Sequence, residues 1–344
     1  MKKVVILGGG FAGAYAARHL QNHFDVTLVD TKDYFEFTPS VLRVLVEPEH
    51  SVTIEVAHRD YLPKCEVVMG TVTAVKENEV VVEDKKRFYF DYLVICTGSH
   101  YRSHIKEDNL IRSRRIHDLK KYAREVEKAH SILIVGGGVV GTELAAEIIT
   151  AFPEKSVTII DSNKELLMRS PPKVRKYAKE FMTKHNVTMI LGEKIADEEQ
   201  KKFKTNTGRE IKVETAFLCT GITPNSDFLM EISPEWLDER QYILVNDFLQ
   251  VKGQKNIFSA GDVNAIREEK TAQSAEKQAE IVVKNILRME RGKELIKYIH
   301  NEKPMVISLG KDDGILVYKN FVLRGIIPGF LKRVIEWKTM KQYR

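Results

Sequence analysis

Two glycine-rich motifs have the spacing that proteins use to bind the pyrophosphate of a dinucleotide. Residues 8–13 read GGGFAG and residues 136–141 read GGGVVG, so both match G-x-G-x-x-G. In this pattern the first glycine allows a tight turn, the second lets the backbone approach the pyrophosphate, and the third lets helix and strand pack closely. The pyrophosphate then lies on the free N–H groups of the following helix. Two such sites predict two bound dinucleotides, and electron transfer between them is the simplest chemistry for the pair.

The elements around each motif have the order that a βαβ unit requires. Residues 4–7 and 132–135 are short apolar runs typical of buried strands, and a helical pattern follows each motif. The second strand of each unit ends in an acid, Asp30 or Asp161, placed to accept hydrogen bonds from an adenosine ribose. A plain glycine turn in an α/β sheet would explain one motif, but not two with matching acids.

Three later strands end in small or acidic residues. Residues 91–98 and 214–221 each form an apolar run that closes in Cys-Thr-Gly, and residues 256–262 close in Gly-Asp. A turn of small residues can come against a bound dinucleotide where a bulky side chain would collide. The repeated Cys-Thr-Gly strand indicates an internal duplication of the dinucleotide-binding unit.

Composition describes an ordinary globular protein. The chain has 344 residues, which is enough for two domains and a small third, with 43% hydrophobic and 30% charged residues. No segment approaches the roughly 18 uninterrupted apolar residues of a membrane span. The formal charge of +6 is mild for this length and is compatible with attraction to anionic membranes or polyanions.

The three cysteines, Cys65, Cys96 and Cys219, have neither C-x-x-C nor metal-ligand spacing. We therefore expect no metal site and a reducing compartment, in which cysteine serves as a small buried residue. The first strand begins directly after the N-terminus, which leaves no room for a signal peptide, and Lys2 excludes N-myristoylation. A cytoplasmic location follows as an expectation.

Further elements can be read from the hydrophobic pattern. We predict a β-meander (67–75, 79–83 and 86–90), a helix and strand (174–185 and 187–191), a hairpin after Pro234, a long helix (271–291), and a strand with a turn (305–309 and 311–314). The basic residues 112–115 read as a solvated linker between the two halves.

These features together resemble the flavoproteins that carry two dinucleotide-binding domains. The resemblance implies an α/β fold of the glutathione-reductase type, with two Rossmann-like domains and a small C-terminal α+β segment. It implies FAD on the first motif and NAD(P)H on the second, with the late Gly-Asp strand returning to the flavin. The implied domains are a discontinuous FAD domain (1–112 and 226–295), an inserted NAD(H) domain (113–225) and a C-terminal segment (296–344).

Within that superfamily the chain is most similar to the ferroptosis suppressor proteins, also described as apoptosis-inducing-factor homologues. The matching pieces are residues 136–147, 218–222, 245–251, 309–314 and the ending WKTMKQ at 337–342. This likeness implies an NAD(P)H-dependent reductase of membrane quinones whose C-terminal segment lies near quinone and membrane. Residues 272–278 (AQSAEKQ) are also similar to type II NADH:quinone dehydrogenases, although Lys277 stands where a second glutamine is expected.

The resemblance assigns residues to sites. Predicted FAD contacts are Gly8, Gly10, Phe11, Ala12, Gly13, Asp30, Lys32, Thr97, Gly98 and Asp262. Predicted NAD(P)H contacts are Gly136, Gly138, Gly141, Asp161, Thr220 and Gly221. Predicted catalytic residues are Glu143, near the nicotinamide, with Gln273 and Lys311; Glu143 could instead be a helix N-terminal acid that stabilises the dipole. Asp161 would repel a 2′-phosphate and so favours NADH, an inference that the nearby Lys164 weakens.

The absence of suitably placed cysteines restricts the class of electron acceptor. Disulfide reductases need a dithiol beside the flavin, coenzyme A disulfide reductases need a cysteine within 35–45, and sulfide:quinone reductases need one after Cys219; none is present. A quinone then fits best as acceptor, with oxygen as a slow side reaction. The tail, residues 330–344, is basic and amphipathic, a pattern that fits a membrane contact and packing on the core or in a dimer equally well. The lipid-soluble acceptor favours the membrane contact.

Three hypotheses remain open at the sequence level. The leading one is a peripheral-membrane NADH:quinone oxidoreductase, with a homodimer as one assembly. The second is a soluble reductase that passes electrons to a ferredoxin-like protein or to oxygen. The third is a redox-controlled scaffold that binds polyanions, for which the residues give the least support because the dinucleotide-binding motifs of both halves are intact.

Overall fold

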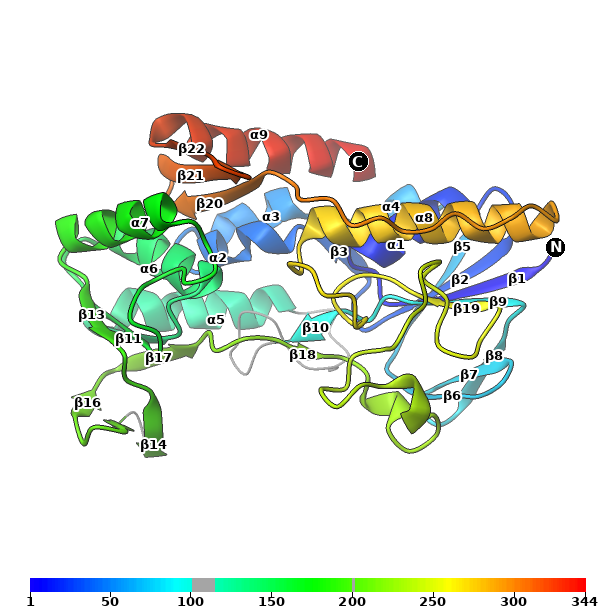
Figure 1. The fold of residues 1–344 in the computed structure, drawn as a ribbon, viewed down its shortest axis with the longest axis horizontal. Coiled ribbons are helices and arrows are strands. Elements are labelled where there is room, and N and C mark those ends of the chain that lie inside the picture. The colour runs from blue at the N-terminus through cyan, green and yellow to red at the C-terminus, as the bar shows by residue number, and fades with distance from the viewer. Residues whose placement is uncertain (101–114, 200–201) are drawn as a thin grey trace.

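Two parallel sheets form the centres of two lobes in the computed structural model, which describes residues 1–100, 115–199 and 202–344 (Figure 1). The first sheet has the order β19-β9-β1-β2-β5, and the second the order β13-β12-β11-β17. Their strands are β1 (Lys3–Leu7), β2 (Asp25–Asp30), β5 (Cys65–Met69), β9 (Tyr92–Ile95), β19 (Ile257–Ser259), β11 (Ser131–Val135), β12 (Ser156–Asp161), β13 (Thr188–Leu191) and β17 (Thr215–Leu218). The predicted fold class, with two Rossmann-like units, is confirmed.

Both faces of the first sheet are covered, which explains its continuous apolar strands. Val4 and Ile6 face helices α1 (Phe11–Leu20) and α8 (Ala272–Glu290), whereas Val5 and Leu7 lie in a second apolar cluster with the meander. The meander consists of β6 (Val72–Val75), β7 (Glu79–Val82) and β8 (Lys86–Tyr89). The start of the predicted meander, residues 67–69, instead belongs to β5 and pairs in parallel with β2.

The second sheet is covered in the same way. Helices α5 (Arg115–Lys128), α6 (Val139–Ala151) and α7 (Pro172–Lys184) contribute to the main core on one face. A small antiparallel sheet of β14 (Ile195–Glu199), β15 (Lys202–Thr205) and β16 (Glu210–Lys212) closes the other around Phe203. Sequence reasoning predicted α7 and β13 but not this small sheet.

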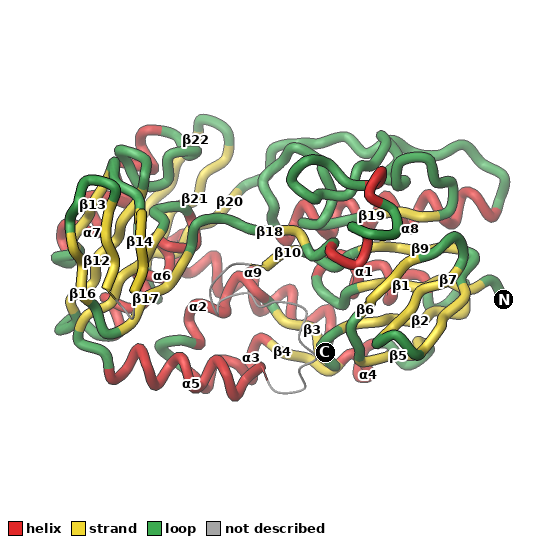
Figure 2. Tube along the Cα trace, turned by 90° about the horizontal axis from the view of Figure 1, so that it is seen from below, coloured by secondary structure: helices red, strands yellow, loops and turns green. Residues whose placement is uncertain are grey.

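A compact segment between β2 and β5 lies between the two lobes (Figure 2). It contains β3 (Tyr34–Glu36), η1 (Thr38–Ser40), α2 (Val41–Val44), η2 (Pro48–His50), α3 (Ser51–Ile54), β4 (Glu55–Ala57) and α4 (His58–Tyr61). Helix α2 contacts α6 of the second lobe, and α3 contacts the C-terminal helix. These short elements, which the hydrophobic pattern did not predict, join all parts of the molecule.

The chain also crosses between the lobes at β10 (Ser99–His100) and β18 (Thr223–Pro224), which pair antiparallel. Two 3₁₀ turns follow, η3 (Asp227–Leu229) and η4 (Pro234–Trp236), and the expected hairpin is present as isolated antiparallel bridges, Leu237 to Ile243 and Val245 to Val251. Of the predicted linker 112–115, residues 112–114 lie outside the described part of the chain, and Arg115 begins α5.

The C-terminal unit is a three-stranded antiparallel sheet covered by one helix. Strands β20 (Met305–Leu309), β21 (Asp313–Tyr318) and β22 (Phe321–Arg324) pair in order, and α9 (Ile326–Tyr343) runs from this sheet toward the first lobe (Figure 1). The predicted strand 305–309 and the turn after it are confirmed. Across the described residues, no helix combines the length and apolar content that crossing a bilayer requires.

Candidate active site

The two glycine turns repeat one geometry in atomic detail. Gly8 and Gly136 have φ of +92° and +116°, and a Cβ on either would collide with the carbonyl oxygen of Cys96 or Cys219 on the neighbouring strand. A side chain is therefore excluded at both positions by backbone conformation and by space. The structure supports the duplication expected from the repeated Cys-Thr-Gly strands.

The later glycines of each motif have two different roles. A Cβ on Gly13 or Gly141 would overlap the carbonyl oxygen of Gly8 or Gly136, so these glycines permit close packing of helix on strand. Gly10 and Gly138 are the N-caps of α1 and α6, neither has a side-chain cap, and no atom lies within 4 Å of a Cβ placed there. The N–H groups of both helices therefore face open space, which fits the pyrophosphate of a dinucleotide.

The acids at the strand ends are held in place by neighbouring groups. Asp30 accepts a hydrogen bond from the Thr31 amide at 2.8 Å, and its second oxygen lies 3.1 Å from His58 Nε2. Asp161 accepts hydrogen bonds from the Gly137 amide at 2.5 Å and from both nitrogens of Asn163. Each acid is thus oriented beside its glycine turn, where a ribose would follow the pyrophosphate.

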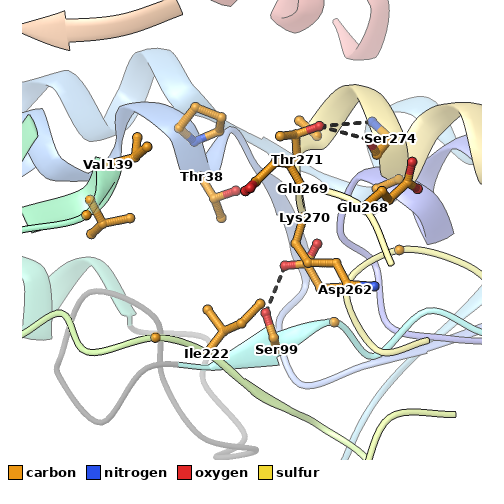
Figure 3. A pocket seen from close by; sticks show the side chains of 18 of the residues that line it. Thr38, Ser99, Val139, Ile222, Asp262, Glu268, Glu269, Lys270, Thr271 and Ser274 are labelled. Carbon is orange, nitrogen blue, oxygen red and sulfur yellow. Dashed lines mark hydrogen bonds between the residues drawn. The ribbon is translucent and has the colours of Figure 1, made fainter. Parts of the chain in front are cut away.

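One continuous cavity of about 1980 Å³ joins the two turns. Figure 3 shows side chains from both lobes around it, with Val139, Thr38 and Thr271 above and Ile222, Ser99 and Asp262 below. Most of the predicted site residues line it: Gly8, Gly10, Phe11, Ala12, Asp30, Lys32, Thr97, Gly98, Gly136, Gly138, Glu143, Asp161, Thr220, Gly221, Asp262 and Gln273. The predicted residues that do not are Gly13, Gly141 and Lys311.

The small-residue turns lie where the lobes meet. Gly98 and Gly221 have φ of +70° and +118°, with no atom within 4 Å of a Cβ placed on either. Thr97 donates its hydroxyl to the carbonyl oxygen of Asn225 at 2.6 Å, and the Asn225 side chain donates back to the Thr97 carbonyl at 2.9 Å. Ser99 donates to Asp262 at 2.8 Å. These bonds join the turn after β9 to the returning chain.

Glu143 joins the second lobe to the C-terminal unit beside the shared cavity. Its Oε1 accepts hydrogen bonds from the Ser308 amide at 2.8 Å, the Ser308 hydroxyl at 3.1 Å and the Lys332 ammonium at 2.8 Å. Both ionic side chains are largely buried, with 8% of Glu143 and 13% of Lys332 exposed. Sequence reasoning identified Glu143 but missed Ser308 and Lys332, because only tertiary structure brings the tail to α6.

A second buried ion pair lies one helical turn further along α6. Arg43 of α2 contacts Glu147 at 3.3 Å, with both side chains almost fully buried. Burial raises the pKa of Glu147, although Arg43 and Lys332 oppose the change. The pair ties the segment between β2 and β5 to the second lobe, and no local pattern in the sequence marked it.

The other two predicted catalytic residues occupy different places. Gln273, at the start of α8, lines the cavity and donates from its amide to the Pro304 carbonyl at 3.2 Å. Lys311 is an exposed residue of the turn between β20 and β21, where it pairs with Glu47 at 2.9 Å. The structure therefore brings Glu143 and Gln273 to one cavity but leaves Lys311 outside it, because its turn points to the surface.

The cysteines are poorly suited to redox chemistry. Cys96 and Cys219 are buried directly after β9 and β17, and burial raises the pKa of each thiol to about 12. Cys65 is half-buried, and burial raises its pKa to about 12 as well. Among the residues that the structure describes, no group of three or more His, Cys, Asp or Glu side chains could hold a metal ion.

Helix α9 has an inner face of mixed polarity and an outer face that exposes large apolar side chains. Lys332, Ile335 and Thr339 line the cavity. On the outside, the exposed large apolar side chains are Ile326, Ile327, Phe330, Val334 and Trp337, with exposed fractions from 38% to 73%. A helix that only covered a core would expose polar side chains at these outer positions.

Comparison with known proteins agrees with this geometry. Residues 2–279 match the family described as pyridine nucleotide-disulphide oxidoreductase. The chain is 31% identical to ferroptosis suppressor protein 1 of Xenopus tropicalis, covering 91% of this chain and 87% of that protein. It is 33% identical to apoptosis-inducing factor homolog A of Dictyostelium discoideum, covering 97% and 88%.

A solved structure shows the same fold. The NDH2 of Plasmodium falciparum, determined in complex with NADH, superposes with a TM-score of 0.82 at 16% identity, covering 99% of this chain and 98% of that one. The predicted resemblance to the ferroptosis suppressor proteins is thus confirmed by sequence, and the two-lobe architecture by structure. The chain belongs to the pyridine nucleotide-disulphide oxidoreductase family and is an FAD-dependent NAD(P)H oxidoreductase.

Proposed function

We propose that the protein transfers a hydride from NADH to FAD and passes the electrons to a quinone at a membrane surface. The observation that carries this proposal is the two-faced helix α9. Its inner face lines the cavity that both dinucleotide motifs share, and its outer face exposes Phe330, Val334 and Trp337. A lipid-soluble acceptor could therefore pass from a bilayer, beneath one helix, to the flavin.

In this proposal the two lobes hold different cofactors. Residues 1–112 and 226–295 bind FAD, residues 113–225 bind NADH, and residues 296–344 face the quinone and the membrane. Gly8, Gly10 and Asp30 hold the adenosine and pyrophosphate end of FAD, and Asp262 lies nearer its centre, while Gly136, Gly138 and Asp161 have the matching roles for NADH. When bound, the two dinucleotides supply hydride transfer, and the protein supplies orientation and exclusion of water.

Asp161 supports a preference for NADH over NADPH. Its carboxylate lies beside the second glycine turn, where a 2′-phosphate on the adenosine ribose would meet a negative charge. Lys164, the cation that weakened this inference from sequence, is not among the residues that line the cavity. Arg169 and Lys194 do line the cavity, so the preference for NADH rests on the charge of Asp161 beside the glycine turn.

The proposed quinone path lies between the start of α8 and the inner face of α9. Ala272 and Gln273 line it from α8, and Ile335 and Thr339 line it from α9. The Lys332 ammonium, held by Glu143 and Ser308, is the cation of α9 that lines the same cavity. It is placed to stabilise negative charge that develops on an acceptor oxygen during reduction.

The proposed membrane contact combines apolar and basic residues of α9. Lys341 lies over the Trp337 ring at 5.2 Å, and Arg333 lies over the Phe330 ring at 5.7 Å. Aromatic side chains flanked by cations suit the interface of an anionic bilayer. This arrangement supports peripheral binding through one helix face.

The test uses one soluble and one membrane-bound acceptor. NADH oxidation by the full chain is measured with a short-chain ubiquinone analogue in solution and with long-chain ubiquinone in phosphatidylcholine vesicles containing phosphatidylserine. We expect Phe330→Gln/Trp337→Gln to keep its rate with the soluble analogue and lose most of it with vesicles. The matched control is Met230→Gln/Ile232→Gln, because these exposed apolar residues lie near η3 and η4, on the side of the molecule opposite α9 (Figure 1).

Two outcomes would contradict the proposal. Turnover no faster with either quinone than with air would point to a protein acceptor such as a ferredoxin, or to a scaffold with feeble turnover and salt-dependent polyanion binding. Quinone turnover with equal losses in both double variants would keep the reductase and exclude α9 as the membrane contact.

A further inference from the structure

A chain of buried contacts, two hydrogen bonds and one ring contact, connects the first dinucleotide site to the end of α9. His58 is fully buried at the start of α4, with Nε2 3.1 Å from Asp30 Oδ2 and Nδ1 2.6 Å from the Tyr61 hydroxyl. Tyr61 is itself buried, and its ring packs edge-on against Tyr343 with centroids 5.0 Å apart. Two residues, His58 and Tyr61, therefore link the acid Asp30 to Tyr343 at the end of α9.

The proton positions in this chain follow from its chemistry. An ionised Asp30 can only accept, so His58 Nε2 must carry the proton that the two share. The Nδ1 atom of a neutral imidazole is then an acceptor, and the Tyr61 hydroxyl donates to it. Burial raises the pKa of Tyr61 above its ordinary value, which keeps this donor protonated at neutral pH. Each Asp30 oxygen thus has one fixed donor and a lone pair directed elsewhere.

His58 and Asp30 also explain why position 9, between the first two glycines of the motif, is a glycine. A Cβ on Gly9 would collide with the His58 ring and lie 2.6 Å from Asp30 Oδ2. The imidazole therefore packs directly against the turn that receives the pyrophosphate. Any movement of His58 changes both the ribose acid and the space behind that turn.

Tyr343 reaches the same turn by a second route. Its ring is 2% exposed and stacks on Phe35 with centroids 4.1 Å apart. Phe35 in turn packs edge-on against Phe11, inside the first glycine motif, at 5.2 Å. Arg344 donates to the carbonyl oxygens of Val52 and Thr53, which fastens the end of the helix.

We propose that Tyr343, Tyr61 and His58 are positioning residues for FAD: they fix the Asp30 carboxylate and the Phe11 ring, so that the docked end of α9 slows FAD release. The inference rests on the assignment of FAD to the first motif in the proposed function. It makes the last helical residue part of the support of a cofactor site on another lobe.

The first test removes the Tyr61 hydroxyl from the full-length, FAD-loaded protein. FAD release after dilution is followed by the recovery of free flavin fluorescence. We expect Tyr61→Phe to accelerate release roughly three- to tenfold, because His58 loses the donor that fixes its tautomer and ring.

Tyr92→Phe is the matched control for loss of a buried tyrosine hydrogen bond. The Tyr92 hydroxyl donates to Glu290 at the same 2.6 Å, and Tyr92 is buried to a similar extent. Its register with Val4 places it at the opposite end of the sheet from Asp30. We expect a comparable fall in the melting temperature of the protein but an unchanged FAD release rate.

The second test separates the Tyr343 ring from its hydroxyl. Tyr343→Ala removes the stack on Phe35 and the contact with Tyr61, so we expect faster FAD release. Tyr343→Phe keeps both ring contacts, so we expect the wild-type rate. If FAD release from Tyr61→Phe and Tyr343→Ala were as slow as from Tyr92→Phe, this inference would be overturned and the proposed function would stand. A wild-type chain that binds no FAD would overturn the proposed function as well.

Discussion

At the scale of single residues, the charge on Lys332 is the most consequential feature that sequence reasoning did not identify. Lys332 and Glu143 are 2.8 Å apart in a largely buried site, and Ser308 donates to the same carboxylate oxygen. Removing one member of such a pair leaves the other as an uncompensated buried charge, which costs more than the pair itself contributes. The pair therefore couples the stability of the C-terminal unit to the chemistry of the cavity.

Lys332→Met should lower the free energy of unfolding by about 3 kcal/mol, because Glu143 then stays buried with only the Ser308 donors. The double variant Glu143→Gln/Lys332→Met should recover part of that loss without recovering NADH oxidation. Urea unfolding and steady-state kinetics check the two expectations. Arg333→Met is the control, since Arg333 pairs with the exposed Asp312 at 3.6 Å. Equal free energies of unfolding for Lys332→Met, Glu143→Gln/Lys332→Met and Arg333→Met would contradict a special role for the buried Lys332–Glu143 pair.

The cysteines should be inert toward alkylation. Burial raises the pKa of Cys96 and Cys219 to about 12, so both thiols stay protonated until the pH approaches that value. At pH 8 only about one thiol in 10⁴ is a thiolate. We expect NADH oxidation to survive prolonged iodoacetamide treatment between pH 6 and 9. Mass spectrometry that finds rapid modification in step with lost activity would contradict this and reopen thiol chemistry.

At the scale of elements, different glycines of one G-x-G-x-x-G motif have different physical functions. Gly138 faces open space at the start of α6, whereas Gly141 faces the carbonyl oxygen of Gly136. The first position concerns the ligand, and the second concerns the packing of helix on strand. Substitutions at the two positions should therefore fail in different ways.

Gly138→Ala should fold normally and bind NADH at least tenfold more weakly, because its methyl group occupies the space that the pyrophosphate approaches. Gly141→Ala should be less stable by about 3 kcal/mol, since helix and strand must separate to accept a Cβ. Thermal unfolding and fluorescence titration with NADH distinguish the two results. Normal stability in Gly141→Ala would show that α6 shifts without cost.

Helix α9 should depend on pH through Glu336. Its carboxylate accepts hydrogen bonds from the Ser40 hydroxyl and, at 3.1 Å, from His50. Burial opposes ionisation, but these partners and nearby Arg43 outweigh it and lower the pKa of Glu336. A lowered folded-state pKa adds stability that is complete above the ordinary carboxyl range and is lost as the pH falls below it.

Glu336→Gln should therefore be less stable than the wild type at pH 7 and equally stable near pH 3. Urea unfolding at both values measures the difference. Glu239→Gln, at an exposed position, should match the wild type at both pH values. A constant difference between Glu336→Gln and the wild type at pH 7 and pH 3 would exclude the carboxylate charge as the cause.

At the scale of the whole molecule, the sequence predicted what depends on residues close together in the chain. Gly8, Gly13 and Asp30 belong to one βαβ pattern with fixed spacing, so their approach to one turn follows from local rules. Lys332 and Tyr343 could not be placed in the same way, because their partners Glu143 and Tyr61 are set by how α9 docks. The tail was expected to be amphipathic, but its partners Glu143 and Tyr61 decide which face of the helix is buried.

The segment between β2 and β5 shows the same limit. Its helices and strands are three or four residues long, too short for a hydrophobic period to emerge. It nevertheless provides Arg43, His50 and His58, which contact the second lobe, α9 and the ribose acid. Lys311 was predicted because residues 309–314 resemble a turn of the ferroptosis suppressor proteins. Such a resemblance does not show which side of the molecule the turn faces.

The order of strands in the first sheet has a consequence for how the protein is made. Strand β19 pairs with β9 at the sheet edge, yet the ribosome synthesises the entire second sheet, β11 to β17, between them. The nascent second lobe can close while the first still exposes the edge of β9. The lobe that begins first is therefore completed only after the strands of the second sheet have been synthesised.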